Sequence, residues 1–118
     1  MMRMVRTGLM ALSLAIPSVS GAQTVSPLRY LDGNTLYEHC NTSGTTAFLV
    51  CSYYIIGIAD VMLGSNAVDD RRMCAGMKVT NVQAVDVVKN FLTAHPELRH
   101  HNAAGLVAAA LSEAFPCK

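Results

Sequence analysis

The hydrophobic positions of this chain recur mainly at helical spacing. The clearest stripe lies near the C-terminus, before Pro116, at i, i+3, i+4, i+7, i+8 and i+11: Ala103, Leu106, Val107, Ala110, Leu111 and Ala114. Another stripe is formed by Val82, Val85, Val88 and Leu92. Both spacings place apolar side chains on one face of a helix.

The boundaries of the second of these helices are marked by its flanking residues. Thr80 followed three residues later by Gln83 is a capping-box pair, which predicts the start of the helix. His95 and Pro96 are expected to end it, because proline removes a backbone donor and clashes with the preceding turn.

An earlier run, residues 47–63, is apolar around the whole circumference of a helix. Ile55 and Ile56 would also suit a strand, but the length of the run and its lack of alternation favour a helix. A helix that is apolar on every side is expected to be buried on every side, inside its own domain or against another subunit. Asp60, near its end, argues against a transmembrane segment.

Shorter elements complete the pattern. Residues 35–40 are expected to form a short helix capped by Asp32 or Asn34, and residues 41–46 a turn. Residues 64–78 form the longest irregular and most charged segment, and a connection of this length is either functional or merely mobile. The sequence therefore predicts an all-α fold, a small disulfide-stapled helical bundle of about four helices.

The N-terminus has the features of an export signal. Arg3 and Arg6 precede an apolar run over residues 9–16, and Ser20, Gly21 and Ala22 supply the small residues of a cleavage site. Cleavage is expected after Ala22, which removes 22 of 118 residues and leaves residues 23–118 as a single domain of 96 residues. The apolar run is much shorter than the ~20 residues of a membrane-spanning helix.

Charge excludes some partners. Removing Arg3 and Arg6 from the nine basic residues leaves seven against eight acidic residues, a net charge of −1. Nothing in this balance supports binding to nucleic acid or attraction to an anionic membrane after signal cleavage.

Four cysteines in an exported chain of this size predict two disulfides. Cys40 and Cys51 flank a short turn, whereas Cys74 and Cys117 flank two helices expected to form a hairpin. This geometry favours the pairs Cys40–Cys51 and Cys74–Cys117. The other two pairings stay open, because the chain-entropy model gives them similar totals. A peptide map that links Cys51 to Cys74 would contradict the favoured pairing.

Catalytic and metal-binding patterns fail on spacing. Three histidines lie near Glu97 in the sequence, namely His95, His100 and His101, but they lack the helical pair of an HExxH site. The chain has no CxxC motif, and no glycine-rich elbow surrounds Ser52 or Ser112. We therefore expect no enzyme activity, no metal and no cofactor.

Several segments together carry a family resemblance. They are CSYYIIGIAD at residues 51–60, Cys74, HPE at residues 95–97 and FPC at residues 115–117. Over residues 31–117 the chain resembles the Rap/Tai family of bacterial immunity proteins. It departs from the family at Tyr53, where glycine is usual, and at Ala75 and Gly76, which replace a segment that usually holds a proline.

The resemblance implies a function without chemistry. Members are small, helical, periplasmic and often dimeric, and they neutralise cell-wall-degrading effectors of type VI secretion systems. It implies a periplasmic homodimer that sterically inhibits a peptidoglycan amidase effector. Residues 64–73 are our candidate contact segment, since function concentrates on loops held by rigid elements. The candidate contact residues are Asp69, Asp70, Arg71 and Arg72.

Other interpretations of the chain stay open. A mixed charge run is more often a solvated face, and a standard interface of roughly 1,200 to 2,000 Å² needs a helix face in addition to this loop. Two other classes are a small periplasmic chaperone that exposes an apolar helix in acid, and an accessory protein with an endogenous envelope partner. Acid-induced dimer dissociation with dye binding would indicate the first, and co-purification of only the cell's own wall enzymes the second.

Overall fold

The computed structural model describes residues 21, 31–64, 66–76 and 78–118. The predicted signal peptide, residues 1–22, and its cleavage after Ala22 lie outside these residues apart from Gly21.

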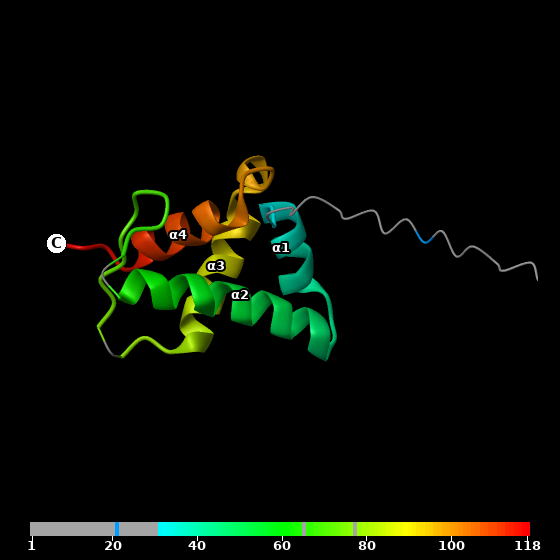
Figure 1. Cartoon of the computed structure of the whole chain (residues 1–118), viewed down its shortest axis with the longest axis horizontal. Coiled ribbons are helices and arrows are strands. Elements are labelled where there is room, and N and C mark those ends of the chain that lie inside the picture. Colours follow the sequence, from blue (N-terminus) through cyan, green and yellow to red (C-terminus); the bar gives the residue numbers. More distant parts are fainter. Residues whose placement is uncertain (1–20, 22–30, 65, 77) are drawn as a thin grey trace, which may run out of the picture.

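Four α-helices form the described fold: α1 (Gly33–Asn41), α2 (Thr45–Leu63), α3 (Asn81–Ala94) and α4 (Ala103–Ala114). A short 3₁₀ helix, η1 (Pro96–Leu98), lies between α3 and α4. Each of the four α-helices contacts the other three (Figure 1). The prediction of an all-α bundle is confirmed.

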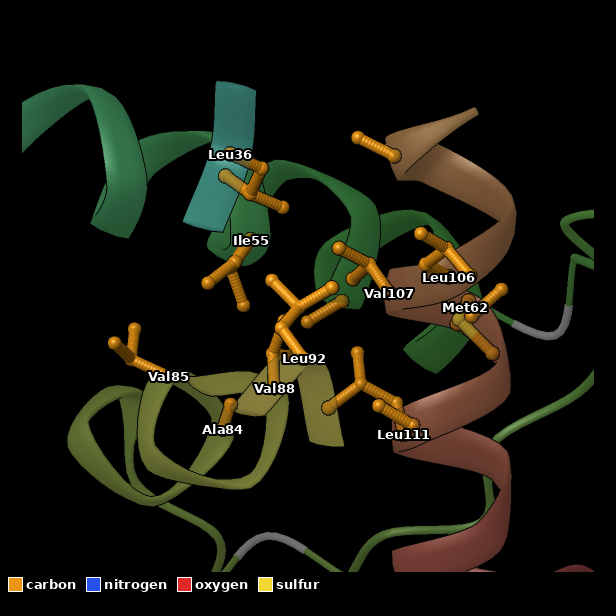
Figure 2. Packing of buried hydrophobic residues seen from close by; sticks show 14 of the residues in the cluster. Leu36, Ile55, Met62, Ala84, Val85, Val88, Leu92, Leu106, Val107 and Leu111 are labelled. Carbon is orange, nitrogen blue, oxygen red and sulfur yellow. The ribbon is translucent and has the colours of Figure 1, made fainter. Parts of the chain in front are cut away.

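The core lies where the four helices converge. Its largest fully buried side chains come from every helix (Figure 2): Leu36, Ile55, Met62, Val88, Leu92, Val107 and Leu111. Burial of each contributes roughly 1.5 to 3 kcal/mol relative to an exposed position. The predicted stripe of α4 is confirmed except at Ala114, which is exposed, and Ala108 and Ala109 widen its buried face.

The caps explain where two of the helices begin. The Asp32 carboxylate accepts a 2.8 Å hydrogen bond from the backbone N–H of Thr35, which lowers the pKa of Asp32. Asp32 rather than Asn34 is thus the cap, and α1 begins two residues earlier than expected. At α3, Thr80 and Gln83 form the predicted capping box, with hydrogen bonds of 2.8 and 3.2 Å.

The prediction that α2 is buried on every side is wrong within one chain. Cys51, Ile55, Ala59 and Met62 face the core, but Tyr53 and other apolar residues around the rest of the helix are exposed, as is Phe48 near its start. Each of the other three helices contacts α2. By length and composition alone α2 is apolar enough to cross a membrane, and it is the one such helix among the described residues. Four of its residues, Cys51, Ile55, Ala59 and Met62, nevertheless belong to the core cluster of the bundle.

Val82 is a second departure from the predicted pattern. It is 68% exposed, whereas the buried residues of α3 are Ala84, Val85, Val88 and Leu92. The core-facing stripe of α3 therefore begins at Ala84, after the capped first residues of the helix.

Two disulfides close the fold, and they join the favoured pairs. Cys40–Cys51 links the end of α1 to α2, and Cys74–Cys117 links the segment before α3 to the segment after α4. All four cysteines of the chain are thus paired. Through Cys74, the second disulfide attaches the long connection between α2 and α3 to the segment after α4.

Candidate interaction surface

The segment between α2 and α3 contains a tight two-residue hairpin, which we call the charged turn (residues 68–71). The N–H of Val68 donates to the carbonyl of Arg71 at 3.1 Å, and the reverse bond is 3.0 Å. The central residues Asp69 and Asp70 have φ of 53° and 57°. Positive φ at both positions is the geometry of a type I′ turn, and aspartate tolerates it better than most residues do.

Contacts on both sides hold the charged turn against the bundle. Val68 packs against the core, and Met73 is buried. The next residue, Cys74, is bonded to Cys117, and its N–H donates to the carbonyl of Phe115 at 3.0 Å. Figure 1 shows this green segment beside the red end of α4. The charged turn is therefore fixed to α4 rather than connected only through α2 and α3.

The four candidate contact residues lie together: three belong to the charged turn, and Arg72 directly follows it. Asp69, Asp70, Arg71 and Arg72 are all exposed. Two acidic side chains are followed by two basic ones, so this segment presents both signs of charge within a few residues. Their role in binding a partner stays a prediction.

A groove of about 570 Å³ lies between the charged turn and α4. Its lining includes Asp69 and Arg71 from the charged turn. It also includes His101, Glu113 and apolar side chains such as Leu106 from α4 and the segment before it. The sequence did not predict His101 or Glu113 at this surface, because only the folding of the long connection onto α4 brings them near the turn. The groove therefore joins residues of the charged turn to residues of α4 and of the segment before it.

A glycine lies where the charged turn touches α4. A Cβ atom on Gly105 would come 3.0 Å from Oδ2 of Asp69. A glycine inside a predicted helix often has a packing reason, so Gly105 is the sequence signal that points to this contact.

The histidines form separate local contacts. His95 Nδ1 lies 3.1 Å from the Glu97 carboxylate, and the pKa of Glu97 is lowered by its own backbone N–H and then by His95. The rings of His100 and His101 are 4.0 Å apart. Within the described ranges, no three histidine, cysteine, aspartate or glutamate side chains are grouped so that they could hold a metal ion.

The hydroxyls of the helical serines Ser52 and Ser112 are not hydrogen-bonded to a basic side chain among the described residues. The Ser52 hydroxyl is buried without a hydrogen-bond partner among the described residues, and the Ser112 hydroxyl donates to the carbonyl of Ala109 at 3.0 Å. A serine nucleophile is activated by an adjacent base.

A second surface is apolar and lies on the exposed side of α2. We call it the α2 face, and its residues are 37 to 68% exposed: Phe48, Leu49, Val50, Tyr53, Val61, Leu63 and, from α3, Val82. Beside it a groove of about 310 Å³ runs between α2 and the start of α3. Exposed apolar residues in this number, where they are contiguous, commonly mark a protein–protein contact.

Comparison with known proteins identifies a family. The family model for Rap1a immunity proteins matches residues 32–117. No curated protein and no solved structure matches the chain. The matched range includes all four helices, both disulfides and the charged turn.

Proposed function

The chain belongs to the Rap1a immunity protein family, and on this premise we propose that it binds and sterically inhibits a cell-wall-degrading effector, a peptidoglycan amidase delivered by type VI secretion. The family is not enzymatic, and its members act on a cognate toxin. The family match over residues 32–117 is the observation that carries the proposal.

The rigidity of the scaffold supports an inhibitory role. An inhibitor must fill or cover the cleft of an enzyme without being processed itself, and preorganisation lowers the entropy lost on binding. Here the charged turn is fixed by two backbone hydrogen bonds and by the neighbouring Cys74–Cys117 disulfide. We propose that Asp69, Asp70, Arg71 and Arg72 contact the effector, together with the wall of α4 across the groove.

We also propose export to the periplasm with cleavage after Ala22. The two disulfides and the family fit an oxidising compartment. The intact mass of the protein recovered from the periplasm tests the cleavage site, and a mass that includes residues 1–22 would contradict it.

Immunity itself is tested by co-expression. We expect that a small amidase encoded by a neighbouring gene is toxic when exported to the periplasm and harmless when this protein is produced with it. Lysis curves with and without the protein measure the effect. Failure to protect against every amidase effector encoded nearby would contradict the proposed target class.

The contact role of the charged turn is tested by removing charge while keeping its shape. In the variant D69N/D70N/R71Q/R72Q, asparagine retains the tolerance for positive φ. We expect the dissociation constant for the effector to rise at least tenfold, since residues near the centre of an interface carry most of its energy. Calorimetry measures it. The control E38Q/K89Q changes charges on α1 and α3, and equal weakening in both variants would contradict a specific role for the turn.

We propose that the α2 face pairs with a second copy of the chain. The helix is apolar all round, yet one side finds no partner within the described part of its own chain, and a two-fold contact would cover the same patch on both subunits. Tyr53, where the resembling family usually has glycine, is 67% exposed on this face and adds bulk to the contact.

Charge on the α2 face is expected to separate the subunits. In F48E/Y53E, two carboxylates would be buried without partners, and an uncompensated buried charge is strongly unfavourable. We expect a monomer by sedimentation velocity at micromolar concentration, where the unmodified protein is a dimer. N90E, on an exposed position of α3, is expected to remain dimeric. A monomeric unmodified protein would contradict the proposal.

The exposed α2 face also favours a second candidate function, a small periplasmic chaperone that binds unfolded clients through this surface. Under this alternative, acid would dissociate the dimer and increase the binding of a hydrophobic dye. Dimer retention at low pH without dye binding would leave the inhibitor as the better explanation.

A further inference from the structure

The charged turn is positioned by a contact with α4 that involves a glycine. Gly105 lies in the third position of α4. Because it has no Cβ, the Asp69 side chain comes within 3.0 Å of where that atom would stand, with Asp69 Cγ at 3.6 Å. Contacts of a Cβ at such a distance require the neighbour to shift.

Glycine is otherwise a poor choice at this position. In a helix interior it costs roughly 0.5 to 1 kcal/mol relative to alanine, and α4 is elsewhere rich in alanine. Gly105 is half-buried, not left-handed, and therefore has no conformational need for glycine. The close approach of Asp69 is the feature that gives this glycine a physical reason.

We infer that Gly105 is a positioning residue for the charged turn: it lets the Asp69 carboxylate pack onto α4 and so sets the orientation of the turn and the width of the neighbouring groove. The inference rests on the proposed function, since it assumes that an effector reads the turn. Its structural part, however, is measurable in the free protein.

The turn would have little freedom to absorb a displacement. Asp69 and Asp70 already have positive φ, and both backbone hydrogen bonds of the turn join Val68 to Arg71. Val68 is also packed against the core. Rotation of the exposed Asp69 side chain can absorb the few tenths of an ångström that a Cβ at position 105 requires. A larger side chain at position 105 is expected to push Asp69 further outward and to open these hydrogen bonds rather than to move the turn as a unit.

The test compares leucine at two helical glycines. In G105L, we expect amide exchange at Val68 and Arg71 to rise at least tenfold, with a smaller rise in G105A, while the helical circular dichroism is unchanged. In the control G57L, the new side chain begins where no atom lies within 4 Å, and exchange in the turn is expected to stay the same.

A double variant shows whether the effect passes through Asp69. In D69G the side chain that meets position 105 is absent, and glycine accepts the same φ. Adding G105A to D69G is then expected to leave exchange at Val68 and Arg71 unchanged, unlike G105A alone. An equal increase in both backgrounds would overturn the inference.

Effector binding separates this inference from the proposed function. We expect G105L to raise the dissociation constant for the effector at least fivefold. We expect G57L to leave amide exchange in the charged turn unchanged. Unchanged exchange in G105L would overturn the positioning role whatever the effector does. Faster exchange with unchanged affinity would overturn the role of the turn in recognition, whereas protection by the unmodified protein in co-expression would still establish immunity.

Discussion

Replacing Cys74 and Cys117 together by alanine is expected to lower the free energy of unfolding by about 4 kcal/mol. The two cysteines are 43 residues apart, and on the chain-entropy model their bond restricts the unfolded chain in proportion to the logarithm of that separation. The bond also joins the segments that flank α3 and α4, so its loss frees the end of α4 from the long connection.

The size of this loss is large for a domain of this length. Small domains are stable by only about 5 to 15 kcal/mol, so a loss of about 4 kcal/mol would remove a large part of the total. The double variant is therefore expected to be partly unfolded at growth temperature and to be degraded in the periplasm. Loss of immunity would follow from abundance, not from a damaged surface.

Urea unfolding followed by circular dichroism measures the effect. The matched comparison is C40A/C51A, in which the cysteines are 11 residues apart and the expected loss is about 3 kcal/mol. Removing the longer ring should thus cost more. A loss below about 1 kcal/mol for C74A/C117A, or the reverse order of the two variants, would contradict the chain-entropy explanation.

The helices could be predicted from the sequence because they depend on local spacing, and the disulfides could be predicted from the expected positions of the helix ends. The stripe of Leu106, Val107 and Leu111 has a helical period and is buried, and Thr80 with Gln83 forms the predicted cap. Cysteine pairing followed from where the helix ends were expected to meet. Element boundaries differed by two residues at α1 and α2, where the cap of Asp32 and the chain after Gly44 decide the first turn.

The sequence did not predict which residues of α2 are buried. Periodicity tells which residues of a helix are apolar, but it does not tell how many neighbours the bundle supplies. Tyr53 and Ile55 are equally consistent with a buried helix, yet Tyr53 is 67% exposed and Ile55 is fully buried. The distinction depends on packing between helices that are distant in the sequence.

Only part of the candidate contact surface could be predicted from the sequence. The charged residues 69–72 were recognisable as a polar break, whereas the adjacent wall of His101 and Glu113 depends on the long connection folding back onto α4. The Asp-Asp pair also lacks the strong turn signal of Asn-Gly or Asp-Gly. Gly105 did carry a signal, as a glycine within an alanine-rich helix.

Gly33→Ala is expected to lower the free energy of unfolding by about 3 kcal/mol, because overpacking of a fixed contact typically costs about 1 to 3 kcal/mol. A Cβ atom at this position would collide with Leu106 Cδ1 and would lie 2.8 Å from the carbonyl oxygen and 2.9 Å from the Cα of Arg99. The side chain of Leu106 can rotate, but the backbone of Arg99 cannot easily retreat.

Arg99 is held from three directions. Its Nε donates to the carbonyl of Leu92 at 2.6 Å, its guanidinium lies 3.6 Å from the centre of the Tyr37 ring, and its own carbonyl accepts from the N–H of Asn34 at 2.8 Å. The N–H of Gly33 in turn donates to the carbonyl of His101 at 2.9 Å. Pushing the two backbones apart would therefore strain the hydrogen bonds that join α1 to the start of α4.

The sign of the effect distinguishes packing from helix propensity. Gly33 is the first residue of α1, and glycine-to-alanine changes in a helix are ordinarily stabilising by roughly 0.5 to 1 kcal/mol. Gly57→Ala on α2, where nothing lies within 4 Å of the new Cβ, is expected to show that ordinary gain. Urea unfolding of both variants gives the comparison. If Gly33→Ala were as stable as Gly57→Ala, the junction between α1 and residues 99–101 would have to be more compliant than its hydrogen bonds imply, and the close approach of the two backbones would not be a determinant of the fold.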